Sequence, residues 1–238
     1  MNLTDFTTLT FDCYGTLIDW ESGMVNGLAP LTERVGGLTR NQILEAHAWH
    51  ESRQQAQTPA MLYRDLLAIV YRRLAEEWGV PVSWDECKQY GQSVKNWPPF
   101  PDSAESLQYL KQHYKLIILS NVDYESFSAS NEKLRVDFDA LYLAEAIGHY
   151  KPAAENFDYM FDMLGRLNIE KSNILHVAES MFHDHAPANR HGLASCWIYR
   201  RHDQEGFGAT MNPGDMPSVD FRFNSMAELV EAHKAAAR

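Results

Sequence analysis

The chain has 238 residues, of which 45% are hydrophobic and 22% charged, and its formal net charge is −11. This length accommodates one large α/β domain, or a core with a smaller inserted domain, and the composition is that of a globular protein. The acidic excess argues against a nucleic-acid partner, because binding to phosphates depends on clustered Lys and Arg side chains.

Targeting and redox features predict a cytoplasmic protein. The first residues lack the basic segment and the long apolar segment of a secretory signal. No stretch approaches the ~18 consecutive apolar residues of a membrane span, so we expect no membrane partner. The cysteines are far apart and form no CxxC pair, so we expect reduced, buried thiols at Cys13, Cys87 and Cys196.

Short apolar runs between turn residues predict the strands of a sheet. Continuous apolar runs of this length suit strands that are covered on both faces, as in a parallel sheet. The segments between the runs have helical periodicity, so the predicted fold class is α/β, with a doubly wound, Rossmann-like parallel sheet as its core. The predicted strands are residues 9–11, 116–119, 140–143, 174–177, 196–199 and 221–223.

The first two predicted strands are separated by about 100 residues, which is more than a simple crossover needs. Residues 43–55 and 84–94 have helical patterns, and a third helix is expected to begin at Thr58, with Pro59 at its first position. We therefore predict an α-helical cap of residues 20–97, inserted into a core formed by residues 1–19 and 98–238.

Further helices are predicted after the insertion. Asp102 and Glu105 have the spacing of a capping box at a helix start. Residues 225–237 are expected to form the final helix. After Pro152, one apolar stripe at helical spacing indicates core packing, and it consists of Phe157, Met160, Phe161 and Leu164.

Polar residues follow the predicted strands at their carboxyl ends. The sites of open parallel sheets lie beyond these ends, so we expect the residues to converge on one point. They are Asp12, Tyr14 and Thr16 after the first strand, Ser120 and Asn121 after the second, Lys151 beyond the third, and Glu179, Ser180 and Asp184 after the fourth.

These residue types form a coherent chemical set. The Asp12 carboxylate could attack an electrophilic carbon or phosphorus and form a covalent intermediate. Lys151 would favour the ionised form of Asp12 and help to hold a small anionic substrate. Ser120 and Asn121 can donate hydrogen bonds to an oxyanion or to the nucleophile. Asp184 could orient a water molecule or bind a metal.

The same residues resemble the motifs of a known family. Residues 11–17 resemble the first motif of the haloacid dehalogenase-like hydrolases, and Ser120-Asn121 resembles the second. Lys151-Pro152 is similar to the third motif, and the acidic residues after the fourth predicted strand are similar to the fourth. The resemblance implies that the insertion closes over the site. The catalytic group that it implies is Asp12, Thr16, Ser120, Lys151 and Asp184.

Tyr14 indicates the branch of this family. Phosphatases of the family usually carry a second Asp at this position, which protonates the leaving oxygen, and a phenol is a poor acid at neutral pH. Halide leaves without a proton. Tyr14 with the following Gly-Thr-Leu, and residues 196–198, resemble the L-2-haloacid dehalogenases of type II. This resemblance implies attack by Asp12 on C2 of a small 2-haloacid, hydrolysis of the resulting ester to a 2-hydroxy acid, no cofactor and a homodimer.

The resemblance also implies roles for the remaining residues. Ser120 and Lys151 would hold the substrate carboxylate and the nucleophile, Asn121 would assist near the halide, and Asp184 would position the water. These dehalogenases also use an Arg in an early helix of the cap, and here either His50 or Arg53 could take that role.

Two departures leave an alternative open. A Tyr that these dehalogenases carry six residues past the Lys is replaced by Phe157. Glu179, which we group with Tyr14 among the substrate-binding candidates, forms with Asp184 a pair similar to that of the magnesium phosphatases. The alternative is therefore a Mg²⁺-dependent phosphatase of a small phosphorylated metabolite, with Asp12, the Tyr14 carbonyl and Asp184 as the metal ligands.

Overall fold

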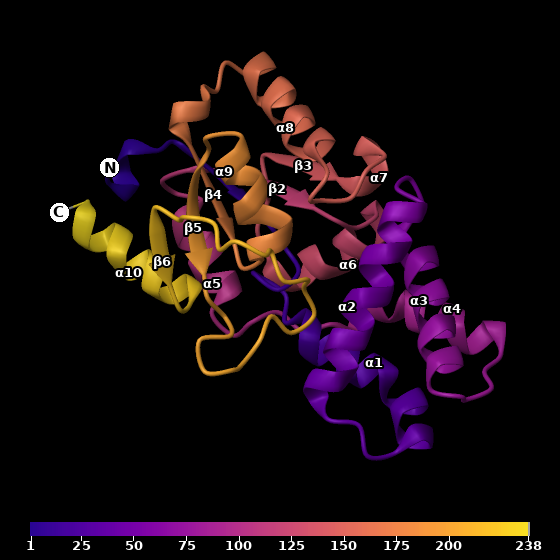
Figure 1. The fold of residues 1–238 in the computed structure, drawn as a ribbon. Coiled ribbons are helices and arrows are strands. Elements are labelled where there is room, and N and C mark those ends of the chain that lie inside the picture. Colours follow the sequence, from indigo (N-terminus) through magenta and orange to yellow (C-terminus); the bar gives the residue numbers. More distant parts are fainter. Residues whose placement is uncertain (238) are drawn as a thin grey trace.

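The structure is a computed structural model that describes residues 1–237. At its centre is a six-stranded sheet in the order β3-β2-β1-β4-β5-β6, in which every neighbouring pair is parallel (Figure 1). The predicted α/β fold is confirmed, and each predicted strand overlaps an observed one. The strands are β1 (Thr8–Phe11), β2 (Lys115–Ser120), β3 (Ala140–Leu143), β4 (Ile174–Ala178), β5 (Ala194–Ile198) and β6 (Phe221–Phe223).

The central strands are apolar because both faces of the sheet are covered. On one face, Ile117 and Leu119 of β2 pack with the apolar stripe of helix α8 (Ala154–Arg166), as predicted, although Phe161 is only partly buried. On the other face, Leu116 and Ile118 belong to a cluster that includes residues of α5 (Ser103–Leu110) and α10 (Met226–Ala236). Alternate residues of one buried strand therefore pack against the helical layers on opposite faces of the sheet, as in a doubly wound fold.

The register of the sheet places the ends of the central strands at one edge. Phe11 of β1 lies opposite Ile118 of β2 and Val177 of β4. The residues that follow these strands therefore emerge side by side. η1 (Leu3–Asp5) precedes β1. The remaining elements of the connections after β2 are α6 (Tyr124–Leu134), α7 (Ala144–Ile147), η3 (Lys171–Asn173), the π-helix η4 (Met181–His185) and α9 (Ala186–Arg190).

Residues 20–96, between β1 and α5, form a group of helices at one side of the sheet, away from α10 (Figure 1). The chain segments that enter and leave it pair with each other, through a bridge between Ile18 and Pro99 and a hydrogen bond from Asp19 N to Pro98 O of 2.8 Å. The group consists of α1 (Trp20–Val35), α2 (Arg40–Gln57), α3 (Tyr63–Glu77), α4 (Trp84–Gly91) and η2 (Gln92–Asn96).

One predicted helix start is wrong, and at a second, correctly placed start the predicted capping bonds do not form. Thr58 ends α2 instead of beginning α3, because its hydroxyl donates to Gln54 O at 3.0 Å. Asp102 precedes α5 but makes no capping bond, since its carboxylate is paired with the Arg200 guanidinium at 2.9 Å. A charge-assisted bond to a largely buried guanidinium is stronger than a bond to a neutral backbone N–H, so the capping box does not form.

The cysteine thiols and the helices of the chain bear on the predicted redox state and on the membrane prediction. Cys13, Cys87 and Cys196 are buried, free thiols, as predicted. Over residues 1–237, no helix combines the length and apolar character needed to cross a membrane. The cytoplasmic location and the homodimer remain predictions.

Candidate active site

Asp12 is the first residue after β1, and both oxygens of its carboxylate accept hydrogen bonds. Its Oδ2 accepts a hydrogen bond of 2.9 Å from Thr16 Oγ1, and its Oδ1 accepts one of 2.9 Å from Lys151 Nζ. A tight turn brings Thr16 back to Asp12. Gly15 in this turn has φ of +99°, and a Cβ there would lie 3.0 Å from Trp20 Nε1, so only glycine fits.

Lys151 joins two carboxylates at the centre of the site. The side chain is 1% exposed, and Nζ donates to Asp12 Oδ1, to Asp184 Oδ1 at 2.6 Å and to Leu119 O at 2.9 Å. Burial by itself lowers the pKa of Lys151, but the charges of Asp12 and Asp184 outweigh it and raise the pKa. The ammonium is therefore a fixed cation whose three N–H donors are all in use.

Asp184 is held in its ionised form. His176 Nε2 and Lys151 Nζ both bind its Oδ1, at 2.9 and 2.6 Å, and His176 Nδ1 in turn lies 2.9 Å from Thr10 Oγ1. Burial favours the neutral acid, yet Lys151 and His176 lower the pKa of Asp184 below its ordinary value. Asp184 Oδ2 is buried and finds no hydrogen-bond partner among residues 1–237, so it is free to bind a ligand.

The two carboxylates differ in their electrostatics. Burial, assisted by the negative charge of Asp184, raises the pKa of Asp12 in spite of Lys151. Opposite shifts at adjacent carboxylates are a common basis for dividing roles between them. The arrangement suits Asp12 as the reacting group and Asp184 as a fixed charge.

The residues after β2 have different roles. The amide of Asn121 is used to hold Lys151, since Nδ2 donates to Lys151 O at 3.0 Å and Oδ1 accepts from Lys151 N at 2.6 Å. Asn121 also lines the cavity over Asp12, and its contact with the halide remains a prediction. Ser120 is 1% exposed, and its Oγ has no hydrogen-bond partner in the described chain, so it can serve a ligand.

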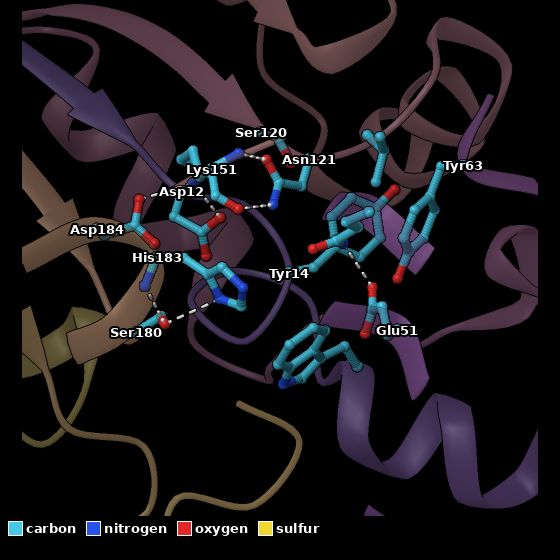
Figure 2. Close-up of a pocket in the computed structure, with 13 residues that line it drawn as sticks. Asp12, Tyr14, Glu51, Tyr63, Ser120, Asn121, Lys151, Ser180, His183 and Asp184 are labelled. Carbon is cyan, nitrogen blue, oxygen red and sulfur yellow. Dashed lines mark hydrogen bonds and ion pairs between the residues drawn. The ribbon is translucent and has the colours of Figure 1, made fainter. Parts of the chain in front are cut away.

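A small cavity lies over these groups, with residues from the sheet edge on one side and residues of α2 and α3 on the other (Figure 2). Its volume is about 30 Å³, which is room for roughly two water molecules. It unites most of the predicted site. The lining residues are Asp12, Tyr14, Trp20, Glu51, Gln55, Tyr63, Ser120, Asn121, Val122, Lys151, Ser180, His183 and Asp184.

The phenol of Tyr14 faces away from Asp12. Its hydroxyl donates to Ser126 O at 3.2 Å and lies 2.8 Å from Ser130 Oγ, both on α6. Burial, with the nearby Cys13 thiol, raises the pKa of Tyr14 well above its ordinary value. The hydroxyl is therefore a structural link to α6 and is not positioned to protonate a leaving group.

His183 is a pocket residue that the sequence did not single out from its His neighbours. Its Nδ1 lies 3.2 Å from Ser180 Oγ, and burial lowers its pKa to about 4. At neutral pH this imidazole is uncharged and adds no cation to the cavity.

Neither candidate for the cap cation reaches the cavity, so that prediction is wrong. His50 Nε2 is paired with Glu77 Oε2 on α3 at 2.7 Å, and the exposed Arg53 guanidinium lies 4.4 Å from the Trp49 ring centroid. Successive helix residues are rotated by about 100°. The face of α2 that lines the cavity is therefore that of Glu51 and Gln55, one turn apart.

Glu179 lies beside the site rather than in it. Its backbone N–H donates to Thr16 Oγ1 at 2.9 Å, while its side chain lines a neighbouring cavity of about 100 Å³ with Glu21 and Arg201. Trp20 lines both cavities. Burial, followed by the charge of Glu21, raises the pKa of Glu179 to about 8. Glu179 is therefore not among the residues that line the cavity over Asp12.

The carboxylates of Asp12 and Asp184 give the cavity oxygen donors of the kind that Mg²⁺ prefers. Over residues 1–237, no three His, Cys, Asp or Glu side chains are grouped so as to hold a metal. Mg²⁺ in proteins is commonly held by only one or two carboxylates, with waters and substrate oxygens completing its coordination. Asp184 Oδ2 could be one such ligand, so Asp12, the Tyr14 carbonyl and Asp184 could hold the ion of the phosphatase alternative, where it would polarise a phosphoryl oxygen.

Residues 6–188 match the haloacid dehalogenase-like hydrolase family. The chain belongs to this family. It is a hydrolase by that membership, and the predicted family resemblance is confirmed.

Individual relatives differ in their named activities. The Escherichia coli (strain K12) pyrimidine 5'-nucleotidase YjjG is 29% identical over 130 residues, which are 51% of this chain and 55% of that protein. The chain thus matches about half the length of this curated relative.

Solved structures of haloacid dehalogenase-like hydrolases share the fold over nearly the whole chain. The L-2-haloacid dehalogenase PA0810 has a TM-score of 0.74 and 21% identity, covering 98% of this chain and 100% of that chain. The L-2-haloacid dehalogenase of Xanthobacter autotrophicus with chloropropionic acid covalently bound has a TM-score of 0.76 and 16% identity, covering 96% and 98%. The fold is therefore that of the L-2-haloacid dehalogenases.

Proposed function

We propose that the protein is a hydrolytic dehalogenase of small 2-halogenated substrates and that it acts through an ester on Asp12. The observation that carries the proposal is the orientation of Tyr14. The residue two places after the nucleophile contributes no acid, because its hydroxyl is engaged by Ser126 and Ser130. A leaving group that needs no proton, such as halide, suits this site.

The reaction has two steps. One carboxylate oxygen of Asp12 attacks C2 of the substrate, the carbon–halogen bond breaks, and halide leaves with the bonding electrons. Water then attacks the carbonyl carbon of the ester, which restores the Asp12 carboxylate and releases the 2-hydroxy product and one proton. The unpartnered Asp184 Oδ2 is the acceptor best placed to orient this water.

The small cavity and the similar structures support a short substrate. The volume of about 30 Å³ leaves no room for a large group in this arrangement. The similar Xanthobacter autotrophicus enzyme carries covalently bound chloropropionic acid. We therefore take three-carbon 2-chloro compounds as the first substrates to test.

The test is halide release by the purified protein in the presence of EDTA. We expect steady release of chloride from L-2-chloropropionate or its amide, with one 2-hydroxy product per chloride. Asp12→Asn removes the nucleophile and should lower the rate by at least ~1,000-fold. Absence of chloride from both substrates at high enzyme concentration would contradict the proposal.

A magnesium-dependent phosphatase remains the second candidate. Two observations favour it: Asp184 Oδ2 is free to bind a cation, and YjjG, with 29% identity, is a nucleotidase. The absence of an acid at Tyr14 opposes it. Hydrolysis of p-nitrophenyl phosphate that requires added Mg²⁺ and is abolished by EDTA, without halide release, would establish this alternative.

A further inference from the structure

The cavity of the candidate active site has an excess of acidic side chains. Asp12, Asp184 and Glu51 line it, and Lys151 is its only cationic side chain among the described residues, because His183 is uncharged at neutral pH. The Lys151 ammonium is already bound to Asp12, Asp184 and Leu119 O. Among residues 1–237, no side chain that lines the cavity therefore offers a free positive charge to a substrate carboxylate.

Glu51 lies on α2 and lines this cavity. It is 5% exposed, and its Oε1 accepts a hydrogen bond of 3.2 Å from Gln55 Nε2, one turn further along the helix. Its Oε2 lies 3.4 Å from His47 Nδ1, and His47 Nε2 lies 2.7 Å from the Tyr90 hydroxyl. Buried polar partners on both sides fix the carboxylate in place.

Glu51 faces the group of catalytic candidates across the cavity. In Figure 2, Glu51 and Tyr63 lie on one side, and Asp12, Lys151 and Asp184 lie on the other. Burial, followed by the charge of Glu51, raises the pKa of Tyr63 well above its ordinary value. Because Glu51 and Gln55 line the side of the cavity opposite Asp12, a substrate with its C2 at Asp12 could place its neighbouring group against them.

We propose that Glu51, with Gln55, determines specificity by selecting substrates that carry a neutral hydrogen-bond donor, such as a carboxamide, where a 2-haloacid carries its carboxylate. The inference rests on the proposed dehalogenase function. The amide N–H groups of such a substrate would donate to the Glu51 carboxylate. A substrate carboxylate there would meet a second negative charge in a poorly solvated space, which is unfavourable.

The test compares two substrates that differ only in this group. Chloride release is measured with L-2-chloropropionamide and L-2-chloropropionate, using the wild type, Glu51→Gln and the control Glu45→Gln, which changes an exposed residue of the same helix. We expect the wild type to favour the amide by at least ~10-fold in kcat/KM, and Glu51→Gln to reduce this preference by at least ~10-fold. Glu45→Gln should retain the wild-type preference.

Binding of the expected products, lactamide and lactate, measured by calorimetry, tests the inference without turnover. If the wild type binds lactamide more tightly than lactate, and Glu51→Gln loses this preference, the inference is supported. If no chloride is released in addition, only the proposed dehalogenase function fails. The inference is overturned if the wild type turns over L-2-chloropropionate faster than the amide, or binds lactate more tightly than lactamide, and Glu51→Gln leaves that preference unchanged. If chloride is released in that case, the dehalogenase function stands.

Discussion

Lys151 and Asp184 form a buried ion pair in which Nζ and Oδ1 are 2.6 Å apart and each side chain is 1% exposed. The same ammonium reaches Asp12 Oδ1 at 2.9 Å. One lysine thus compensates two carboxylates from different strand ends. The pairing holds the predicted nucleophile and the predicted water-orienting group in a single arrangement.

Removal of Lys151 should destabilise the fold as well as abolish turnover. Lys151→Ala leaves two carboxylates buried without their counter-charge, and we expect the free energy of unfolding to fall by about 3–5 kcal/mol in urea titrations. Lys111→Ala is the matched control, because the Lys111–Asp139 pair is partly exposed and should contribute about 1 kcal/mol or less. Equal effects of the two substitutions would contradict the buried pairing.

Thr16 should affect rate through the orientation of Asp12. Its hydroxyl donates to Asp12 Oδ2 at 2.9 Å and accepts the Glu179 N–H at 2.9 Å. Thr16→Val removes a hydrogen bond to a charged group, and we expect kcat to fall by ~10- to 100-fold. Thr16→Ser keeps the hydroxyl and should stay within about 3-fold of the wild type. Similar rates for both variants would show that the hydroxyl is dispensable.

Tyr14→Phe tests whether the phenol takes part in the chemistry. Because the hydroxyl bonds Ser126 O and Ser130 Oγ, its loss should lower the free energy of unfolding by about 1–2 kcal/mol. Chloride release should change by less than about 3-fold under saturating substrate. A loss of two orders of magnitude in kcat, with the fold intact, would mean that the phenol acts in the reaction.

Glu179 should make stability fall as pH rises. Its pKa is about 8 in the folded chain, so the folded state binds more protons than the unfolded state between the unfolded pKa and about 8. Stability from the neutral acid is present below the unfolded pKa and is lost as pH rises through the folded pKa. Glu179→Gln, which cannot ionise, should therefore gain stability relative to the wild type between about pH 5 and pH 8. Urea titrations of both proteins at pH 5 and pH 8 measure this gain. A difference in the free energy of unfolding between variant and wild type that is the same at both pH values would contradict the raised pKa of Glu179.

Most of the fold and of the sheet-edge site could be predicted from the sequence. Buried parallel strands appear as continuous apolar runs, and polar residues directly after them are placed by topology alone. Asp12, Ser120, Lys151 and Asp184 meet for this reason. His176, a polar residue inside an apolar run, was the available signal for the group behind Asp184.

The contribution of α2 could not be predicted in the same way. His50, Glu51 and Gln55 are all buried polar residues of one helix, so hydrophobic periodicity does not reveal which face lines the cavity. The rotation of α2 depends on its packing against α3 and on pairs such as His50–Glu77, which join residues far apart in sequence. The family resemblance pointed to a cation in this helix, whereas the structure places a carboxylate there.

The most direct test of the central claim is a single turnover in H₂¹⁸O with enzyme in excess over L-2-chloropropionamide or L-2-chloropropionate, followed by mass spectrometry of the peptide that contains Asp12. If Asp12 forms an ester that water then hydrolyses at the Asp12 carbonyl, one ¹⁸O enters Asp12 and the 2-hydroxy product is unlabelled. Label in the product hydroxyl, with Asp12 unlabelled, would show that water attacks the substrate directly and would contradict the nucleophilic role of Asp12.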